Sequence, residues 1–321
     1  FIAWKNEFRE QLRVGDVGTD IQLKEDVLKL LFAYNDVFAE NPGAPNPISG
    51  VEHVINLVVG QAVVPRKERL RRCSPKELQA MYDETEKMLR NGIIQPSTSP
   101  WAANVIMVPK PSDPLGGLRY CTDYRTLNRF TIGDSMILPR VDDLLDSLAD
   151  AEVFSMMDAA AGFWGVKVKE EHRHLTAFNT WTHGQMEFGR MPFGLKNAPS
   201  TFQRAMQNIL HPYVCDVVNP ALYMLKAAKA RVEGTPPSDG FITSRDVPEG
   251  YVADAARDKA LSGKRIASLY IDDICVHGKV AEHIDSLAKI LKRLRGNNVS
   301  LKMVKCEFVV TTGKFLSHVV K

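Results

Sequence analysis

The sequence lacks the features that define membrane, disulfide-rich and zinc-binding proteins. No apolar run in the 321 residues approaches the roughly 18 needed to cross a bilayer, so no membrane association is expected. The five cysteines show no CxxC spacing, which argues against a zinc site or a disulfide framework and favours a reducing, intracellular compartment; they stand at positions 73, 121, 215, 275 and 306. The chain begins without Met and has no signal peptide, so we expect it to be a piece of a longer product.

The charge balance is also modest. A net charge of +3 does not by itself indicate a nucleic-acid partner. Basic residues do gather in one short stretch: Arg66, Lys67, Arg69, Arg71, Arg72 and Lys76. A solvated loop and a phosphate-binding surface both remain open for this stretch. Hydrophobic residues make up 45% of the chain and charged residues 25%, as in ordinary globular proteins, and the length suffices for about two domains.

Apolar periodicity predicts helices and short strands in irregular order. Helical spacing predicts helices over 20–38, 75–91, 140–149, 195–213 and 280–295, the second of them opened by a capping box at Ser74. Alternating or β-branched runs predict strands over 51–57, 104–109, 118–122, 153–158, 162–168, 299–302, 305–310 and 313–320. Several of these strands form hairpins, and the pattern predicts an α+β fold with an antiparallel sheet.

An apolar hairpin over 269–278 carries two adjacent aspartates, Asp272 and Asp273, at its turn. Neighbouring carboxylates repel each other, and one interpretation is simply a solvated acidic turn. A third acid, Asp158, ends the strand predicted over 153–158. If the sheet brings the three carboxylates together, they form a site for two hard divalent cations, which prefer oxygen ligands.

Seven ordered motifs favour the metal site. They are GVEHVINL (50–57), LRNGIIQPSTSPWAANVIMVPKP (89–111), RYCTDYRTLNRFT (119–131), LPRVDDLLDSLADAEVFSMMDAAAGFW (138–164), TAFNTWTHGQMEFGRMPFGLKNAPSTFQRAM (176–206), YIDDI (270–274) and LKMVKCEF with FLSHVV (301–308, 315–320). In this order the chain resembles the reverse transcriptase of the gypsy class of long-terminal-repeat retrotransposons, a segment of a Pol polyprotein. The resemblance covers most of residues 50–213 and 266–320.

The resemblance implies a right-hand polymerase with palm and fingers, an antiparallel palm sheet and, in this chain, no thumb. It divides the sequence into an N-terminal helix with a Pro/Gly linker (1–50), fingers (51–140), palm (141–168), fingers again (169–195), a palm helix (196–213), an insertion (214–265) and the palm hairpins (266–321). The insertion separates segments that the family joins almost directly, and we expect it to project from the distal base of the palm.

The resemblance also implies which residues are catalytic. Asp158, Asp272 and Asp273 are expected to bind two Mg²⁺ ions, with Asp158 and Asp273 as the principal ligands. The implied substrates and partners are an RNA or DNA template with its primer, deoxynucleoside triphosphates, and the remaining Pol segments, namely thumb, RNase H and integrase.

Five further residues match the family's contacts with the incoming nucleotide. Lys110 and Arg119 correspond to cations that contact the triphosphate. Phe163 corresponds to the aromatic gate that rejects a ribose 2′-hydroxyl, although simple core packing would also explain it. Phe193 and Gly194 correspond to residues that line the nucleotide pocket.

The chain departs from the family pattern at three single positions. Ala161 and Gly165 replace the usual Ser and Gln near Asp158, and Ser317 replaces a Gly, where its Cβ is expected to crowd a turn. Two alternatives to an active reverse transcriptase therefore remain. One is a truncated or degenerate fragment that keeps the fold and at most binds nucleic acid. The other is an RNA-templated RNA polymerase, which Phe163 disfavours because such an enzyme must admit the 2′-hydroxyl.

Overall fold

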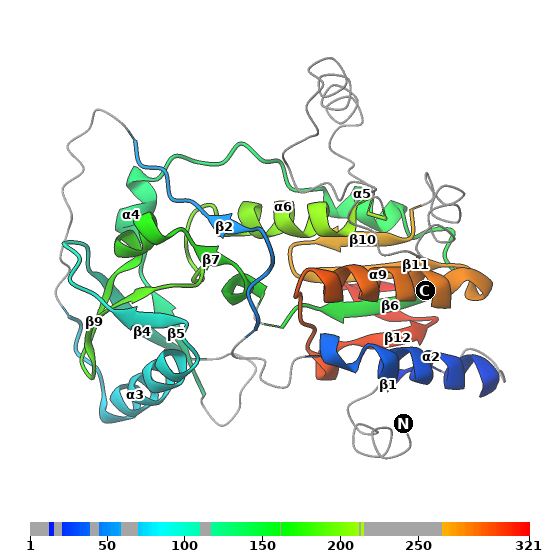
Figure 1. Ribbon diagram of the computed structural model, residues 1–321, viewed down its shortest axis with the longest axis horizontal. Coiled ribbons are helices and arrows are strands. Elements are labelled where there is room, and N and C mark those ends of the chain that lie inside the picture. The colour runs from blue at the N-terminus through cyan, green and yellow to red at the C-terminus, as the bar shows by residue number, and fades with distance from the viewer. Residues whose placement is uncertain are drawn as a thin grey trace, which may run out of the picture.

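Two five-stranded sheets lie side by side in the computed structural model (Figure 1). The structure describes residues 13–15, 21–38, 45–58, 70–109, 117–160, 162–211, 213–214 and 265–321. Several sequence predictions lie outside these residues, namely those for Lys110, Ala161, the basic residues 66, 67 and 69, and most of the insertion. No helix in the described part of the chain is both long and apolar enough to span a membrane.

The first sheet, which we call the aspartate sheet, contains the predicted hairpin. Its strands lie in the order β1 (Arg13–Val14), β12 (Glu307–Val310), β6 (Val153–Asp158), β11 (Asp273–Gly278) and β10 (Ala267–Tyr270). The pairs β10–β11, β11–β6 and β6–β12 are antiparallel, as predicted. The edge strand β1 instead pairs with β12 in parallel, so the sheet is not antiparallel throughout. This correction arises because a distant N-terminal segment supplies the edge.

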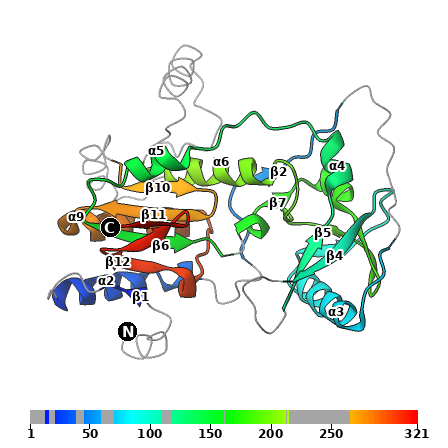
Figure 2. The same ribbon diagram turned by 180° about the vertical axis from the view of Figure 1, so that it is seen from behind.

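Both faces of the aspartate sheet are covered, and the period-two alternation of its strands explains why. Met157 and Ile274 belong to the larger core, which is shared with α2 (Ile21–Ala33), α6 (Ala198–Leu210) and α9 (Val280–Gly296). Phe154 and Cys275 point the other way, into a smaller core with Phe315 and α5 (Val141–Asp146). Figure 1 shows α9 over one face, and Figure 2 shows the hairpin of β13 (Gly313–Phe315) and β14 (His318–Val320) over the other.

The second sheet has the order β3 (Ile94–Pro96), β9 (Gly184–Phe188), β8 (Phe178–Thr180), β4 (Ala103–Pro109) and β5 (Leu118–Thr122). Helix α3 (Pro75–Arg90) packs on this sheet and begins with the predicted capping box. Ser74 Oγ accepts from the Glu77 backbone N–H at 3.3 Å, and the Ser74 N–H donates to Glu77 Oε2 at 2.7 Å. Helix α4 (Arg125–Phe130) follows β5, and η1 (Asn35–Val37), η3 (Glu170–Thr176) and η4 (Met303–Lys305) are short 3₁₀ turns.

Three predicted strands are wrong or much shorter than expected. The segment 162–168 forms the 3₁₀ turn η2 (Gly162–Gly165) and only two strand residues, β7 (Lys167–Val168). A strand would send Phe163 and Trp164 to opposite faces, whereas the turn lets both rings approach Phe193. The predicted strand 51–57 shrinks to β2 (Glu52–His53), paired with β7, and 299–302 provides only isolated bridges at Leu301.

The two borders of the insertion meet at one point. The backbone N–H groups of Ile266 and Ala267 both lie 3.3 Å from the Tyr213 carbonyl oxygen, and Val214 bridges to Ala267. Ala267 begins β10, and the aspartate turn follows the other end of that strand. The two described borders of the insertion therefore lie at the end of β10 that is farther from the aspartates, and the expected course of the insertion itself lies outside the described residues.

Candidate active site

The strand register brings the predicted aspartates together. Asp158, the last residue of β6, lies directly opposite Asp273, the first residue of β11. Side chains of directly opposed antiparallel residues lie on the same face with Cβ atoms about 5 Å apart. The third aspartate, Asp272, is tied to the same place because its carbonyl oxygen accepts from the Ala159 N–H at 3.2 Å. Asp158, which is distant in sequence, thus shares one corner of the sheet with the adjacent pair Asp272 and Asp273.

This corner is electrostatically costly for the isolated chain. Burial, and then the charges of Asp272 and Asp158, raises the pKa of Asp273 to about 6. Burial, and then the charge of Asp158, also raises the pKa of Asp272, although a bond from its own backbone and Lys305 oppose the rise. Both raised pKa values mean that burial and the neighbouring negative charges destabilise the ionised form of these carboxyl groups. A cation placed here relieves that cost.

Lys305 is the functional residue that our sequence reasoning did not single out. It lies in η4, and its Nζ donates to Asp158 Oδ2 at 2.8 Å. Burial lowers its pKa, but the bond to Asp158 and the charges of the three aspartates outweigh burial and raise it. The motif LKMVKCEF contains this lysine, yet nothing in the spacing identified its partner. Lys305 acts as an internal counter-ion of the acidic corner.

The donor chemistry of the corner fits divalent cations of the hard class. All three candidate ligands are carboxylates, whose oxygens suit Mg²⁺. A divalent cation would also neutralise the negative charges that repel one another here. The fit is not that of a preformed centre, because no three His, Cys, Asp or Glu side chains among the described residues already converge as metal ligands. Lys305 Nζ holds one carboxylate oxygen of Asp158 at this corner.

An aromatic cluster lies next to the corner. Phe163, five positions after Asp158, stacks near Phe193 with ring centroids 4.9 Å apart and near Phe202 of α6 at 5.7 Å. The Trp164 ring lies 6.4 Å from Phe193. Phe193 is 57% exposed, so its outer face is available to a ligand. The two aromatic residues predicted to contact a nucleotide are therefore brought together.

Gly194 closes this cluster against the second sheet. Its φ of +91° is readily adopted only by glycine, and a Cβ there would lie 3.4 Å from the Thr122 carbonyl oxygen. Its own carbonyl oxygen accepts from Asn128 Nδ2 at 2.8 Å. The turn that carries Phe193 is thereby fixed to the segment that follows β5.

The predicted phosphate contacts are only partly described. Arg119 lies on β5 opposite Val108, with an exposed side chain, whereas Lys110 lies outside the described residues. Near the end of β5, the Asp123 carboxylate binds Arg125 at 2.6 Å and Arg71 at 3.5 Å. The hydrogen bond from Arg125 is the main cause that lowers the pKa of Asp123. One member of the predicted basic stretch, Arg71, is thus tied to the second sheet.

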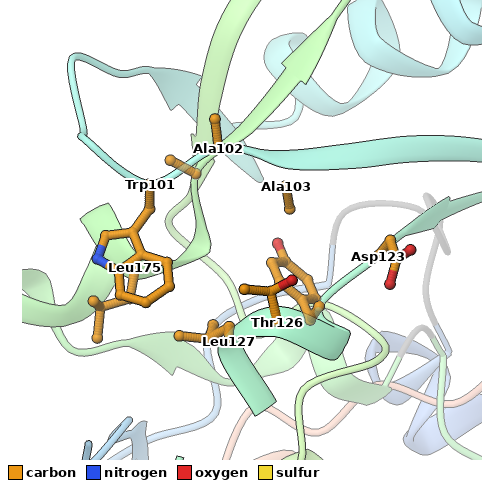
Figure 3. Close-up of a pocket in the computed structure, with 9 residues that line it drawn as sticks. Trp101, Ala102, Ala103, Asp123, Thr126, Leu127 and Leu175 are labelled. Carbon is orange, nitrogen blue, oxygen red and sulfur yellow. The ribbon is translucent and has the colours of Figure 1, made fainter. Parts of the chain in front are cut away.

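A small cavity beside Asp123 is not a substrate site. It is lined by residues that include Tyr124, Trp101, Leu127 and Leu175. Figure 3 shows the side chains of Trp101, Leu127 and Leu175 around it. Its volume of about 10 Å³ accommodates roughly one water molecule. The chemistry of the site is therefore carried by the acidic corner and the aromatic cluster.

Comparisons with known proteins agree with this geometry. Residues 108–320 match the family described as reverse transcriptase (RNA-dependent DNA polymerase). The chain is 29% identical over 273 residues to the Retrovirus-related Pol polyprotein from transposon 297 of Drosophila melanogaster, covering 84% of the chain and 21% of that protein. It is 25% identical over 317 residues to the Transposon Tf2-3 polyprotein of Schizosaccharomyces pombe, covering 98% and 19%. The chain thus spans about a fifth of the length of these curated relatives.

A solved structure shows the same fold. The foamy viral protease-reverse transcriptase, determined in complex with an RNA/DNA hybrid, superposes with a TM-score of 0.71 at 20% identity. The match covers 99% of this chain and 35% of that one. The expected α+β palm-and-fingers fold is confirmed.

Proposed function

Because this chain belongs to the reverse transcriptase (RNA-dependent DNA polymerase) family, we propose that it is the RNA-directed DNA polymerase segment of a gypsy-type retrotransposon Pol polyprotein. The observation that carries this proposal is the direct pairing of Asp158 with Asp273 beside Asp272. The aspartate sheet is the palm and the second sheet the fingers. The proposed palm segments are 141–168, 196–213 and 266–321, and the proposed fingers are 51–140 and 169–195.

In the proposed reaction the three aspartates bind two Mg²⁺ ions. When bound, such ions would supply Lewis-acid stabilisation to phosphoryl transfer, in which the primer 3′-hydroxyl loses its proton, its oxygen bonds to the α-phosphorus of a deoxynucleoside triphosphate, and pyrophosphate leaves. Asp158 and Asp273 face the same side of the sheet and hold the ions, while Asp272 completes the charge. Lys305 already holds one carboxylate oxygen of Asp158, so a bound ion would compete with this lysine for the charge of Asp158.

The nucleotide is proposed to lie over the aromatic cluster. Phe163 acts as the gate against a 2′-hydroxyl, and its ring is held in position by its contacts with Phe193 and Phe202. Phe193 and Gly194 line the pocket, and Lys110 and Arg119 neutralise the triphosphate. The proposed partners are an RNA or DNA template with its primer and the thumb, RNase H and integrase segments of the parent polyprotein.

Primer extension tests this function. Wild-type protein, an RNA template with annealed DNA primer, Mg²⁺ and deoxynucleotides should give extended primer, and Asp273→Asn should abolish extension while leaving template binding intact. Binding without extension by the wild type would refute polymerase activity and support a degenerate copy. Faster incorporation of ribonucleotides than of deoxynucleotides would support the RNA polymerase alternative.

A further inference from the structure

The turn that carries the catalytic aspartates has a strained backbone. Ile271, between Tyr270 and Asp272, has a φ of +54°. This left-handed conformation is uncommon for any residue other than glycine and is unfavourable for a β-branched one. A strained conformation of this kind persists where the surrounding structure holds it in place.

Gln203 on α6 supplies that support. Its side chain is fully buried in a helix face that is otherwise apolar, next to Phe202 and Met206. Gln203 Oε1 accepts from the Ile271 N–H at 2.5 Å. The amide nitrogen Nε2 lies 3.5 Å from the Leu269 carbonyl oxygen, within reach of a weak second bond. Because a backbone N–H requires an oxygen partner, the orientation of the amide is fixed and both groups face the turn.

The same helix touches the other half of the site. The residue before Gln203, Phe202, packs against Phe163 with ring centroids 5.7 Å apart. Adjacent residues of one rigid helix therefore contact the proposed nucleotide gate and the aspartate turn. This placement distinguishes Gln203 from a buried glutamine that merely satisfies nearby backbone groups.

We propose that Gln203 is a positioning residue that holds the Ile271 turn so that Asp272 and Asp273 bind metal together with Asp158. The inference rests on the proposed function of the three aspartates as metal ligands. The hydrogen bond to the buried Gln203 amide offsets the free-energy cost of the left-handed backbone at Ile271. Without that amide, the turn relaxes and the carboxylates lose their shared orientation.

The test compares Gln203→Met, which keeps the side-chain length but removes both polar atoms, with Met206→Leu, a buried change on the same helix face. Mn²⁺ affinity is measured by electron paramagnetic resonance without nucleic acid, and kcat and KM are measured by primer extension. We expect Gln203→Met to weaken Mn²⁺ binding on the order of tenfold, the value of one strong hydrogen bond, and to lower kcat more than it raises the KM for primer-template. Met206→Leu should leave both unchanged.

A second pair of variants tests the strain itself. Asn tolerates the left-handed conformation, so Gln203→Met should weaken Mn²⁺ binding much less in an Ile271→Asn background than in the wild type. If Gln203→Met alone does not fold, Ile271→Asn with and without Gln203→Met should bind Mn²⁺ with similar affinity, and a difference of about tenfold between them would overturn the proposal. Unchanged Mn²⁺ affinity in Gln203→Met, or an equal loss in both backgrounds, overturns the proposal. If the wild type binds Mn²⁺ but extends no primer, the proposed function fails while the metal-binding comparison still decides the role of Gln203.

Discussion

Acidification is expected to destabilise the fold through buried histidines, with His283 the sharpest case. His283 lies on α9, is 1% exposed, and its Nε2 lies 2.8 Å from Ser155 Oγ on β6. Its Nδ1 has no hydrogen-bond partner in the part of the chain that the structure describes. A charged ring here would be desolvated, and its Nδ1–H would have no acceptor among the described residues. Burial, and then the nearby His277, accordingly lowers the pKa of His283 from 6.5 to about 4.

The size of the effect follows from proton linkage. Between pH 6.5 and 4 the unfolded chain takes up a proton at His283 that the folded chain does not, so stability falls as the pH falls. With these two pKa values, the free energy of unfolding at pH 5 is lower by about 2 kcal/mol for each such histidine. His53 and His277 are buried in the same way, and burial, as the largest cause, lowers the pKa of each to about 4.

The assay is urea denaturation at pH 7 and pH 5 for the wild type, His283→Gln and His318→Gln. Gln keeps a polar atom near Ser155 Oγ, and His318 is an exposed control on β14. The wild type and His318→Gln should lose the same stability between the two pH values, and His283→Gln should lose about 2 kcal/mol less. Asp273, whose pKa is raised to about 6, gains protons earlier in the folded chain and works in the opposite direction, but equally in all three proteins. An identical pH dependence in His283→Gln would refute the reasoning.

Four further outcomes follow from the geometry. Lys305→Met should bind Mn²⁺ several-fold more tightly than the exposed-lysine control Lys314→Met, because Asp158 no longer has a competing cation; equal affinities would contradict the counter-ion role. Ser317→Gly should raise stability in thermal denaturation by about 0.5–1 kcal/mol, because Ser317 has a φ of +67°, and a lower melting temperature would count against strain there. Phe163→Ala should raise ribonucleotide relative to deoxynucleotide incorporation, and an unchanged ratio would mean that the ring serves only packing. Replacing residues 216–264 by a short Gly/Ser linker should preserve the melting temperature and Mn²⁺ affinity, because the borders already meet at Tyr213 and Ala267; loss of either would show that the insertion is part of the working palm.

The sequence predicts local features of the fold well and long-range contacts poorly. The capping box at Ser74 and the aspartate hairpin depend on neighbouring residues, and both form as predicted. The edge pairing of β1 with β12 joins segments from opposite ends of the chain, and no local pattern encodes it. The strand predicted over 162–168 fails because aromatic contacts with Phe193 outweigh the β propensity of the segment.

The candidate site shows the same difference between local features, which the sequence predicts, and long-range contacts, which it does not. Asp272 and Asp273 are recognisable in the sequence as an adjacent pair. The family resemblance implied that Asp158 joins them, and the strand register in the structure shows how it does so. Lys305 and Gln203 escaped notice because a lysine in a polar turn and a glutamine in a helix are ordinary residues until their partners are known. Lys305 offsets like-charge repulsion among the aspartates, and Gln203 offsets backbone strain at Ile271. Neither the repulsion nor the strain can be predicted from the residues that flank Lys305 and Gln203 in the sequence.

The acidic corner is therefore a destabilised element supported from two sides. Repulsion among the aspartates is offset by Lys305, and the strain at Ile271 is offset by Gln203. The two supports differ in kind, because a bound ion competes with Lys305 for the charge of Asp158, whereas Gln203 must stay in place while the ions bind. This difference predicts opposite signs for the two substitutions on metal affinity, tighter for Lys305→Met and weaker for Gln203→Met. A general loss of packing at the corner would weaken binding in both, so the pair of signs separates positioning and charge from simple disruption.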